Sequence, residues 1–219
     1  MQVEYVDHLG SDINVVNAAR VSFAKEVVEF DLEKDTKLIN YLTKHNHWSP
    51  LAHTAVTIRV KAPIFMARQF VKHQIGLVWN EESRRYISDE PEFYIPEVFR
   101  GKPVNAKQGS SEDVVGWLES CTDGMSPSEL VYDQTAFALN AYEVLLQGGV
   151  APEQCRMVLP QNVMTNWMWT GSLVAFARVC KLRLDSHAQK EAQELAKLIH
   201  DVIAPLYPVS WQALMNNNN

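Results

Sequence analysis

The sequence has few of the features that mark secreted, membrane-spanning or disulfide-stabilised proteins. It contains only three cysteines, Cys121, Cys155 and Cys180, and their wide spacing suits neither a disulfide framework nor a thiolate metal site. No apolar run approaches the length that crosses a bilayer, and the first twenty residues lack the basic start and apolar core of a signal peptide. We therefore expect a cytoplasmic protein, or one of the host cytoplasm if the source is viral, with no membrane partner.

Glycine-rich nucleotide motifs and an excess of basic charge are also absent. No Gly-x-Gly-x-x-Gly and no Gly-Lys-Ser/Thr loop occurs, so side chains and helix ends must hold any dinucleotide. The formal net charge is −6, whereas nucleic-acid-binding domains are normally basic. A module that stacks RNA or DNA bases on Phe70, Trp79 and Tyr86 stays an alternative, but the acidic total favours no nucleic-acid partner.

The hydrophobic periodicity predicts an α+β fold, with a mainly antiparallel sheet flanked by helices. Residues 53–61 alternate, with Thr54, Val56 and Ile58 on one face, as in a half-buried strand. Residues 157–171 are expected to contain a second strand. Helices are expected at 12–22 with Asp12 as N-cap, from the N-cap Asp35 to about 45, at 127–147, at 172–182, and from Asp185 or Ser186 as N-cap to beyond 203.

The length of 219 residues predicts one domain, residues 1–219. Residues 95–125 are punctuated by proline, glycine and serine, which predicts a surface excursion with one short helix at 111–120. Ser126, Pro127 and Glu129 form a helix-start signal for the long helix that follows. The terminal asparagines, 216–219, are expected to fray.

The stretch 68–86 concentrates cations in an otherwise acidic chain. A helix that begins at Pro63 would place Arg68, Gln69, Lys72 and His73 on one polar face. Gly76 would then end it and a polar loop would follow. A solvated charged face is the alternative, but large apolar residues are interleaved with the charges, and the polar types are those that bind phosphates and bases. We therefore interpret the stretch as a binding site.

Three other constellations carry less weight. His45 and His47 have no nearby carboxylate or thiolate to complete a ligand set, so we expect no metal. Adjacent residues such as Asp185, Ser186 and His187 cannot adopt the mutual geometry of a catalytic triad. The cation of Arg156 would activate Cys155 as a nucleophile, although a buried, inert cysteine is favoured.

The motif Asn80-Glu81-Glu82-Ser83-Arg84-Arg85-Tyr86 resembles the signature of the flavin-dependent thymidylate synthases (the ThyX family), which reads Arg-His-Arg, a spacer, then Asn-Glu-x-Ser-x-Arg-Tyr. Three further motifs follow the family's order and spacing. They are Ala18–Phe23, Glu153–Pro160 with its Glu-x-x-Arg-x-x-Leu-Pro pattern, and Leu182–Glu191, preceded by Thr165 and by Trp169-Thr170. The resemblance covers most of the chain, from about residue 18 to 206, and it implies a ThyX-like fold.

The resemblance implies reductive methylation of dUMP to dTMP, with methylenetetrahydrofolate as carbon donor and FAD reduced by NADPH as hydride source. It also implies a homotetramer with shared active sites. The positions that match the family's dUMP-binding residues are Gln69, Lys72, Glu81, Glu82, Ser83, Arg84, Arg85, Arg156 and Arg183. The positions that match residues at or near FAD are Ser22, His47, Ser49, Lys72, His73, Gln74, Ile75, Glu81, Ser172, Arg178 and His187.

Arg183 matches the family arginine that activates the uracil ring, and a guanidinium is suited to stabilise a developing anion. Local alternatives remain for single residues. Arg183 could pair with Asp185, and His187 could be an ordinary surface residue. Glu153 and Arg156, three residues apart, could be an ordinary helix pair.

The chain departs from the family pattern mainly at the flavin positions. Ser172 and Val174 stand where the family has asparagine and arginine, and Arg178 stands where it has asparagine. Lys72 and Gln74 replace the two arginines of Arg-His-Arg, so bidentate contacts are lost. These changes keep a second hypothesis open, namely a non-catalytic nucleotide-binding protein with a degenerate flavin site.

Overall fold

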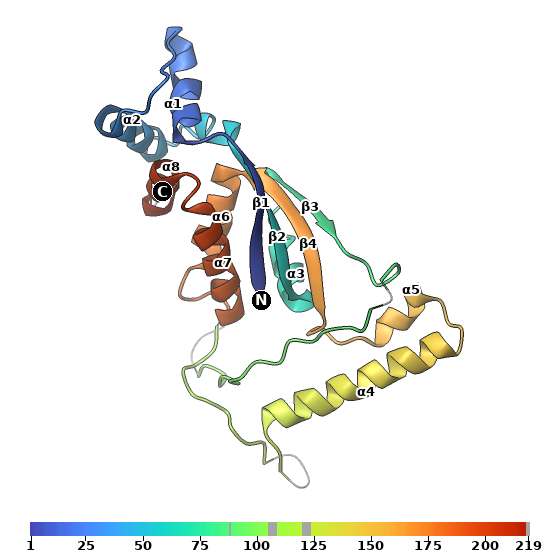
Figure 1. Cartoon of the computed structure of the whole chain (residues 1–219). Coiled ribbons are helices and arrows are strands. Elements are labelled where there is room, and N and C mark those ends of the chain that lie inside the picture. The colour runs from blue at the N-terminus through green and yellow to red at the C-terminus, as the bar shows by residue number, and fades with distance from the viewer. Residues whose placement is uncertain (88, 105–108, 120–123, 218–219) are drawn as a thin grey trace. The chain divides into compact units, whose positions relative to one another are not determined.

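The computed structural model describes residues 1–87, 89–104, 109–119 and 124–217 (Figure 1). The strands are β1 (Gln2–Leu9), β2 (Ala55–Pro63), β3 (Leu77–Glu81) and β4 (Met164–Ser172). The α-helices are α1 (Asp12–Arg20), α2 (Leu32–Lys44), α3 (Ile64–Phe70), α4 (Pro127–Gln147), α5 (Pro152–Cys155), α6 (Leu173–Arg183), α7 (Lys190–Ile203) and α8 (Pro208–Asn216). Short 3-10 helices are η1 (Val21–Phe23), η2 (Pro50–His53) and η3 (Arg156–Val158).

The four strands form one antiparallel sheet in the order β1-β2-β4-β3, which confirms the predicted α+β class. The alternation predicted for the first central strand is confirmed, since Val56, Ile58 and Val60 are fully buried. In β4 the same period buries Trp167 and Trp169. Both central strands therefore turn a mainly apolar side to the core, as half-buried antiparallel strands do, although Thr165 of β4 is also buried.

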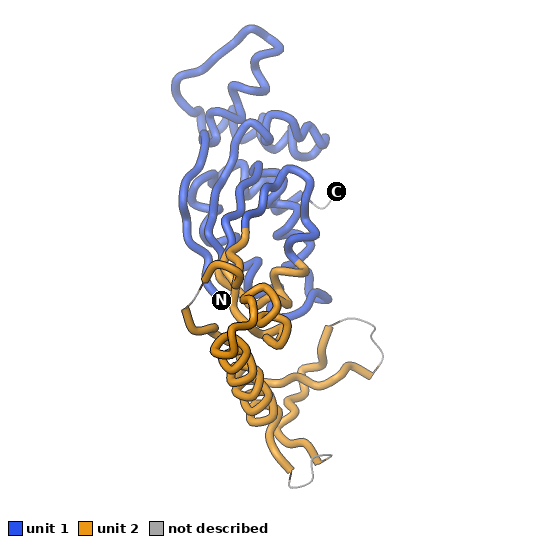
Figure 2. The backbone as a smooth tube through the Cα atoms, turned by 90° about the vertical axis from the view of Figure 1, so that its right-hand side faces the viewer, with its two compact units in different colours: residues 1–60, 70–80, 167–219 blue, residues 61–69, 81–166 orange. Residues whose placement is uncertain are grey.

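The chain divides into two compact units, which Figure 2 shows in blue and orange. The first comprises residues 1–60, 70–80 and 167–219, and the second comprises residues 61–69 and 81–166. The expectation of a single domain stays a prediction.

The core of the first unit is aromatic. The ring of Trp169 meets Phe70 and Phe176 edge-on, with centroids 6.1 and 5.2 Å apart, and Trp79 stacks on Trp167 at 4.3 Å. Such pairs add about 0.5–1.5 kcal/mol each beyond their buried area. Helix α7 packs against α6 and β1, and α8 packs against α2 and α6 (Figure 1). The core therefore fixes α6, which carries several candidate site residues.

The second unit contains the long helix α4, which starts as predicted. Ser126 accepts a hydrogen bond from the Glu129 amide (3.2 Å), and the Glu129 carboxylate accepts one from the Ser126 amide (2.8 Å). The helix packs against α5 and η3, and it buries Tyr142 while Phe137 is exposed. Residues 111–119 form no helix, contrary to the prediction, and the described residues of the excursion contain isolated bridges such as Arg100 with Val114.

Two predicted helix caps were wrong because both carboxylates have buried tertiary partners. Helix α1 is capped by Ser11, and Asp12 instead accepts hydrogen bonds from the amides of Val209 (3.0 Å) and Ser210 (2.8 Å) at the start of α8. Helix α2 begins four residues earlier than predicted, with Asp31 rather than Asp35 as its N-cap. Asp35 is fully buried and pairs with Arg20 at 2.7 Å.

The predicted helix of the central stretch was too long. Helix α3 ends at Phe70, where the amide of His73 bonds to the Phe70 carbonyl (3.0 Å) and closes a tight turn. Lys72 and His73 therefore lie beyond the helix and do not share its polar face. The segment 77–81, which follows Gly76 and was predicted as loop, is the edge strand β3, because it pairs with the distant strand β4, a contact that local composition does not reveal.

Near the carboxyl terminus the observed helix boundaries differ from the predicted ones. Helix α7 begins at Lys190 with Gln189 as cap, since Asp185 instead accepts a hydrogen bond from the His187 amide (2.8 Å). Strand β1 and helix α8 were not predicted. Of the terminal asparagines, Asn216 ends α8 and the Asn217 side chain donates to the Thr43 carbonyl (2.6 Å), whereas residues 218–219 lie outside the described part. Among the described residues, no helix has the length and apolar character needed to cross a membrane.

The buried contact between Asp12 and α8 predicts a measurable stability difference. We expect Asp12→Ala to lower the free energy of unfolding by about 2 kcal/mol, because two helix-terminal amides lose their charged acceptor. Asp12→Asn should lose about half as much, since one acceptor oxygen remains. Chemical denaturation of both variants measures this, with Asp7→Ala, at an exposed position of β1, as the control. Equal stability of Asp12→Ala and wild type would contradict the capping role.

Candidate functional site

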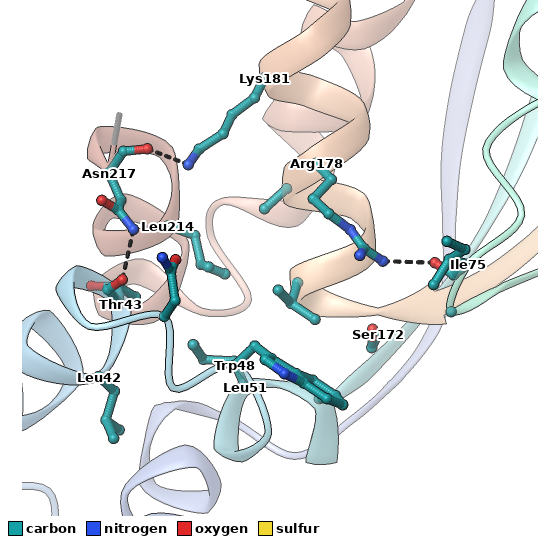
Figure 3. Close-up of a pocket in the computed structure, with 15 residues that line it drawn as sticks. Leu42, Thr43, Trp48, Leu51, Ile75, Ser172, Arg178, Lys181, Leu214 and Asn217 are labelled. Carbon is teal, nitrogen blue, oxygen red and sulfur yellow. Dashed lines mark hydrogen bonds between the residues drawn. The ribbon is translucent and has the colours of Figure 1, made fainter. Parts of the chain in front are cut away.

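A large pocket lies in the first unit, beside the first turns of α6, and we call it the α6 pocket (Figure 3). Its volume is about 700 Å³. Its walls are mostly apolar, and among the described residues the only ionisable side chains that line it are Arg178 and Lys181, one turn apart on α6. The lining residues are Leu42, Thr43, Asn46, Trp48, Leu51, Ala52, Ile75, Gly76, Ser172, Val174, Ala177, Arg178, Lys181, Leu214 and Asn217.

Both cations of the α6 pocket are anchored to backbone carbonyls rather than to carboxylates in the contacts that Figure 3 draws. The Nη2 group of Arg178 donates to the Ile75 carbonyl (2.8 Å), and Nζ of Lys181 donates to the Asn217 carbonyl. Burial lowers the pKa of Lys181. The wall formed by α6 therefore carries positive charge in an apolar setting, where charge–charge attraction is stronger than in water.

A glycine lets the chain pass closely over the start of α6. Gly76 has φ of +77°, and a Cβ atom there would lie 3.2 Å from the Ala175 Cβ and 3.3 Å from the Ser172 hydroxyl. A side chain would thus be both strained and crowded. This close approach is what brings Ile75 to the same pocket as Ser172, the last residue of β4, and Arg178 of α6.

A second cluster of the first unit joins His73 to Arg183. The Nε group of Arg183 donates to Nε2 of His73 at 3.0 Å, and its guanidinium carbon lies 5.5 Å from the centre of the Phe70 ring. Burial, and then the charges of Arg183 and Arg178, lower the pKa of His73. Burial also lowers the pKa of Arg183, which nevertheless stays charged at neutral pH. His73 is therefore a neutral hydrogen-bond acceptor.

The second unit contains a smaller pocket of about 130 Å³, which we call the signature pocket. Its two glutamates are tied to neighbouring residues of β4. Glu81 accepts from the Thr165 hydroxyl (2.8 Å), and Glu82 accepts from the Asn166 amide group (2.8 Å). The lining residues are Ile64, Glu81, Glu82, Ser83, Arg84, Arg156, Leu159, Val163, Met164 and Thr165.

Two arginines supply the positive charge of the signature pocket. The Nε group of Arg84 is buried and has no hydrogen-bond partner among the described residues, while its Nη1 group donates to the Asp89 carbonyl. Nε of Arg156 donates to the backbone carbonyl of Glu153 (3.3 Å). An unsatisfied buried guanidinium nitrogen is costly, so the Nε group of Arg84 is available to a hydrogen-bond acceptor of a ligand.

The structure brings together only part of the predicted site. Of the predicted flavin positions, Ile75, Ser172 and Arg178 line the α6 pocket, and His73 pairs with Arg183. Of the predicted dUMP positions, Glu81, Glu82, Ser83, Arg84 and Arg156 line the signature pocket. His73 and Arg183 line neither pocket, and the other predicted positions outside both linings are Ser22, His47, Ser49, Gln69, Lys72, Gln74, Arg85 and His187.

The structure also bears on the alternative, non-catalytic interpretations of His187 and Cys155. His187 is 84% exposed and pairs with Asp185 at 3.0 Å, so the interpretation as a surface residue is consistent with the structure. Cys155 is fully buried, and its Sγ donates to the Val150 carbonyl (3.2 Å), which agrees with an inert cysteine. Cys121 lies outside the described residues.

Sequence reasoning missed several residues of the α6 pocket. Lys181 follows Arg178 by three positions, so helical spacing alone could have placed it on the same face. Trp48 sits in the His-Asn-His-Trp-Ser-Pro run that had been singled out for its histidines. Leu214 and Asn217 could not be found, because α8 itself was not predicted and its position depends on tertiary contacts.

Comparison with known sequences identifies the family. The family model described as "Thymidylate synthase complementing protein" matches residues 4–209. A flavin-dependent thymidylate synthase of Thermosipho melanesiensis is 37% identical over 213 residues, which cover 97% of this chain and 90% of the relative. The corresponding protein of Thermotoga neapolitana is 37% identical over 217 residues, covering 97% of this chain and 90% of the relative.

Solved structures of a nucleotide methylase have the same fold. The UMP/dUMP methylase PolB from Streptomyces cacaoi, bound with 5-Br dUMP, superimposes with a TM-score of 0.82 at 31% identity and covers 97% of this chain and 93% of its own. The same protein bound with 5-Br UMP gives a TM-score of 0.77 at 30% identity, over 97% and 92% of the two chains. Full-length similarity to both groups leads to one conclusion: the chain belongs to the flavin-dependent thymidylate synthase family.

Proposed function

We propose that this enzyme methylates dUMP to dTMP, with methylenetetrahydrofolate as the carbon donor and FAD reduced by NADPH. The observation that carries the proposal is the signature pocket, in which the family motif 80–86 and the Glu153–Pro160 motif supply two arginines to one small cavity. The activity is that of the relatives by name, and the pocket chemistry is consistent with a nucleotide substrate.

The signature pocket is suited to the phosphate of dUMP. Its volume of about 130 Å³ is below the roughly 300–1,000 Å³ of sites that enclose a whole ligand, so it can take one group of the nucleotide. Arg84 and Arg156 offer charge-assisted donors, each worth about 1.5–3 kcal/mol. Because Thr165 and Asn166 hold the two glutamates, the carboxylates are fixed by partners of their own. By resemblance, the remaining contacts to dUMP come from Gln69, Lys72, Arg85 and Arg183.

The α6 pocket fits FAD. Its volume suits a large ligand, its apolar walls and exposed Trp48 suit a heterocycle, and the ionisable groups that line it in the described part of the chain are cations that suit a pyrophosphate. Ile75, Ser172 and Arg178 would hold the cofactor, with Lys181 as a further cation. By resemblance, FAD also contacts Ser22, His47, Ser49, Lys72, His73, Gln74, Glu81 and His187. When bound and reduced, the flavin supplies the hydride of the reaction.

Arg183 is the residue we propose to activate the uracil ring. A guanidinium stays charged at every relevant pH and can stabilise the negative charge that develops on the pyrimidine. The group is partly buried, and its desolvated setting strengthens that interaction. Its hydrogen bond to His73 means that the guanidinium is oriented before substrate binds, which saves reorganisation during the reaction.

The non-catalytic alternative rests on the substitutions at the flavin positions. Val174 and Gln74 each stand where the family pattern has an arginine, so two cations are missing. Val174 lines the α6 pocket as an apolar residue, and Gln74 lies outside its lining. Arg178, one helical turn after Val174, supplies a cation to the same pocket. We therefore favour a catalytic protein whose flavin is held by a rearranged set of cations.

We also propose that the enzyme is a homotetramer with active sites shared between subunits. The family resemblance implies this assembly, and helix α4 offers a suitable surface. Its side chains Phe137 and Val144, seven positions apart and therefore on one face of the helix, are large, apolar and exposed. Apolar groups exposed together on one helix mark interaction surfaces more often than isolated ones do.

The first test is turnover of dUMP with FAD, NADPH and methylenetetrahydrofolate, followed by chromatography of dTMP. We expect turnover by the wild type. Arg156→Ala should raise the KM for dUMP by about 10- to 100-fold, since it loses a charge-assisted contact. Arg59→Ala, at an exposed position of β2, is the control and should leave KM unchanged. UMP is assayed in parallel. Binding of dUMP without turnover would instead establish the non-catalytic alternative.

The α6 pocket is tested by flavin retention. Wild-type protein mixed with FAD and desalted should keep its visible flavin bands, and these should shift when dUMP is added. Arg178→Ala should retain at least about tenfold less flavin, because the pocket loses one of its two cations. Lys34→Ala, on the exposed face of α2, is the matched control. Unchanged flavin retention by Arg178→Ala would show that FAD binds elsewhere.

The assembly is tested at Phe137, which is 72% exposed on α4. Phe137→Lys places a charge in the apolar surface and should reduce the mass measured by light scattering after gel filtration. Phe137→Leu keeps the position apolar and should preserve the wild-type mass. If both variants retain the wild-type mass, α4 does not form the interface.

A further inference from the structure

The contact between His73 and Arg183 joins two segments 110 residues apart in the chain. His73 follows the turn that ends α3, and Arg183 is the last residue of α6. The Nε–H group of Arg183 donates to Nε2 of His73 at 3.0 Å, which is a normal length for this type of bond. The acceptor atom therefore fixes one edge of the guanidinium.

Only one protonation state of His73 can make this contact. A neutral imidazole with its proton on Nδ1 accepts at Nε2, whereas a protonated ring carries N–H groups at both nitrogens. Protonation would thus replace the hydrogen bond by repulsion between two cations. The charged groups that act on His73 are Arg183 and Arg178, both of α6, and with burial they lower its pKa from the usual value. The ring is consequently neutral near pH 7.

The aromatic ring of Phe70 supports the same orientation. The Arg183 guanidinium carbon lies 5.5 Å from the ring centre, within the distance of a cation–π contact. Phe70 is fully buried and is itself held by the edge-on contact with Trp169. A guanidinium that is fixed at Nε and rests on a rigid ring has less orientational freedom to lose when it binds a ligand.

We propose that His73 is a positioning residue for Arg183: its neutral ring holds the guanidinium in its working orientation, and protonation of the ring releases it and slows the reaction in acid. The consequence for catalysis rests on the proposed role of Arg183. This role is separate from the flavin contact that the family resemblance gives His73, because it acts through the arginine and needs no cofactor.

The expected pH dependence follows from the sign of the pKa shift. Because the pKa of His73 is lowered, the contact is complete at and above the usual histidine range of about 6.5 and is lost as the pH falls through the lower value of the folded protein. A decline of kcat on the acid side of about pH 6.5 is therefore the signature of His73 protonation.

The test compares His73→Gln, whose side-chain oxygen accepts at a similar reach but does not titrate, with His73→Leu, which removes the acceptor. We expect His73→Gln to lose the acid decline and, at about pH 7.5, to keep a higher kcat than His73→Leu. His73→Leu should lower kcat about tenfold at the same pH, with the KM for NADPH unchanged. The exposed His8→Gln is the control, and it should keep the acid decline.

A double-mutant comparison shows whether His73 acts through the arginine. In an Arg183→Lys background, which has no Nε–H group, His73→Leu should have no further effect on kcat. An equal loss in that background, or an acid decline that persists in His73→Gln, would overturn the proposal. Thermal unfolding of each variant identifies any loss of kcat that is due to misfolding.

A ligand-free measurement separates this proposal from the proposed function. The side-chain Nε–H signal of Arg183 in a proton–nitrogen spectrum is identified by its loss in Arg183→Lys. Its chemical shift should change between about pH 7.5 and about pH 5 in the wild type and should not change in His73→Gln. Absence of dUMP turnover with this response intact would reject the proposed function alone. If the chemical shift of this signal changes neither with pH nor with substitution of His73, the positioning contact is rejected, whether or not the enzyme turns over dUMP.

Discussion

The packing of the core and the placement of the site residues depend on the alternation of buried and outward side chains along β4, one of the two central strands of the sheet. Its inward residues include Trp167 and Trp169, each almost fully buried, and these rings contact Trp79, Phe70 and Phe176. Since side chains on a strand alternate strictly, burying these tryptophans also fixes which residues face the other way. Asn166, an outward neighbour, is thereby available to hold Glu82, and the strand runs directly into α6 at Ser172.

Helix α6 connects this packed core to the chemistry. Its buried face, with Phe176 and Val179, is determined by the core. Its remaining positions carry Arg178 and Lys181 at the α6 pocket and Arg183 at the helix end. Three cations so close together on one helix repel one another in water and more strongly in a partly buried site. Each is anchored by a neutral acceptor, namely the Ile75 carbonyl, the Asn217 carbonyl and the His73 ring, which orients the cations without cancelling their charge.

The local part of this arrangement could be predicted from the sequence. Strand β2 and helix α4 were found because each has one clear period or one strong start signal, and these depend only on neighbouring residues. The motif around Ser83 pointed to a nucleotide site for the same reason. The extent of α3, the strand β3 and the position of α8 could not be predicted, because a turn at Phe70 and pairing with distant strands overrode the local pattern. Asp12 and Asp35 show the same limit, since both were read as local caps.

The sequence by itself determined the α+β class, the family and the residue types available for binding phosphate and stabilising an anion. These follow from local periodicity and from short motifs whose members are close in the chain. Only the tertiary structure decided which of those residues meet. It placed Lys181 and Asn217 at the α6 pocket, joined His73 to Arg183, and left Lys72 and His187 outside both pockets. The physical reason is that contacts between distant segments are set by how the apolar faces pack, and no single segment encodes the position of its partner.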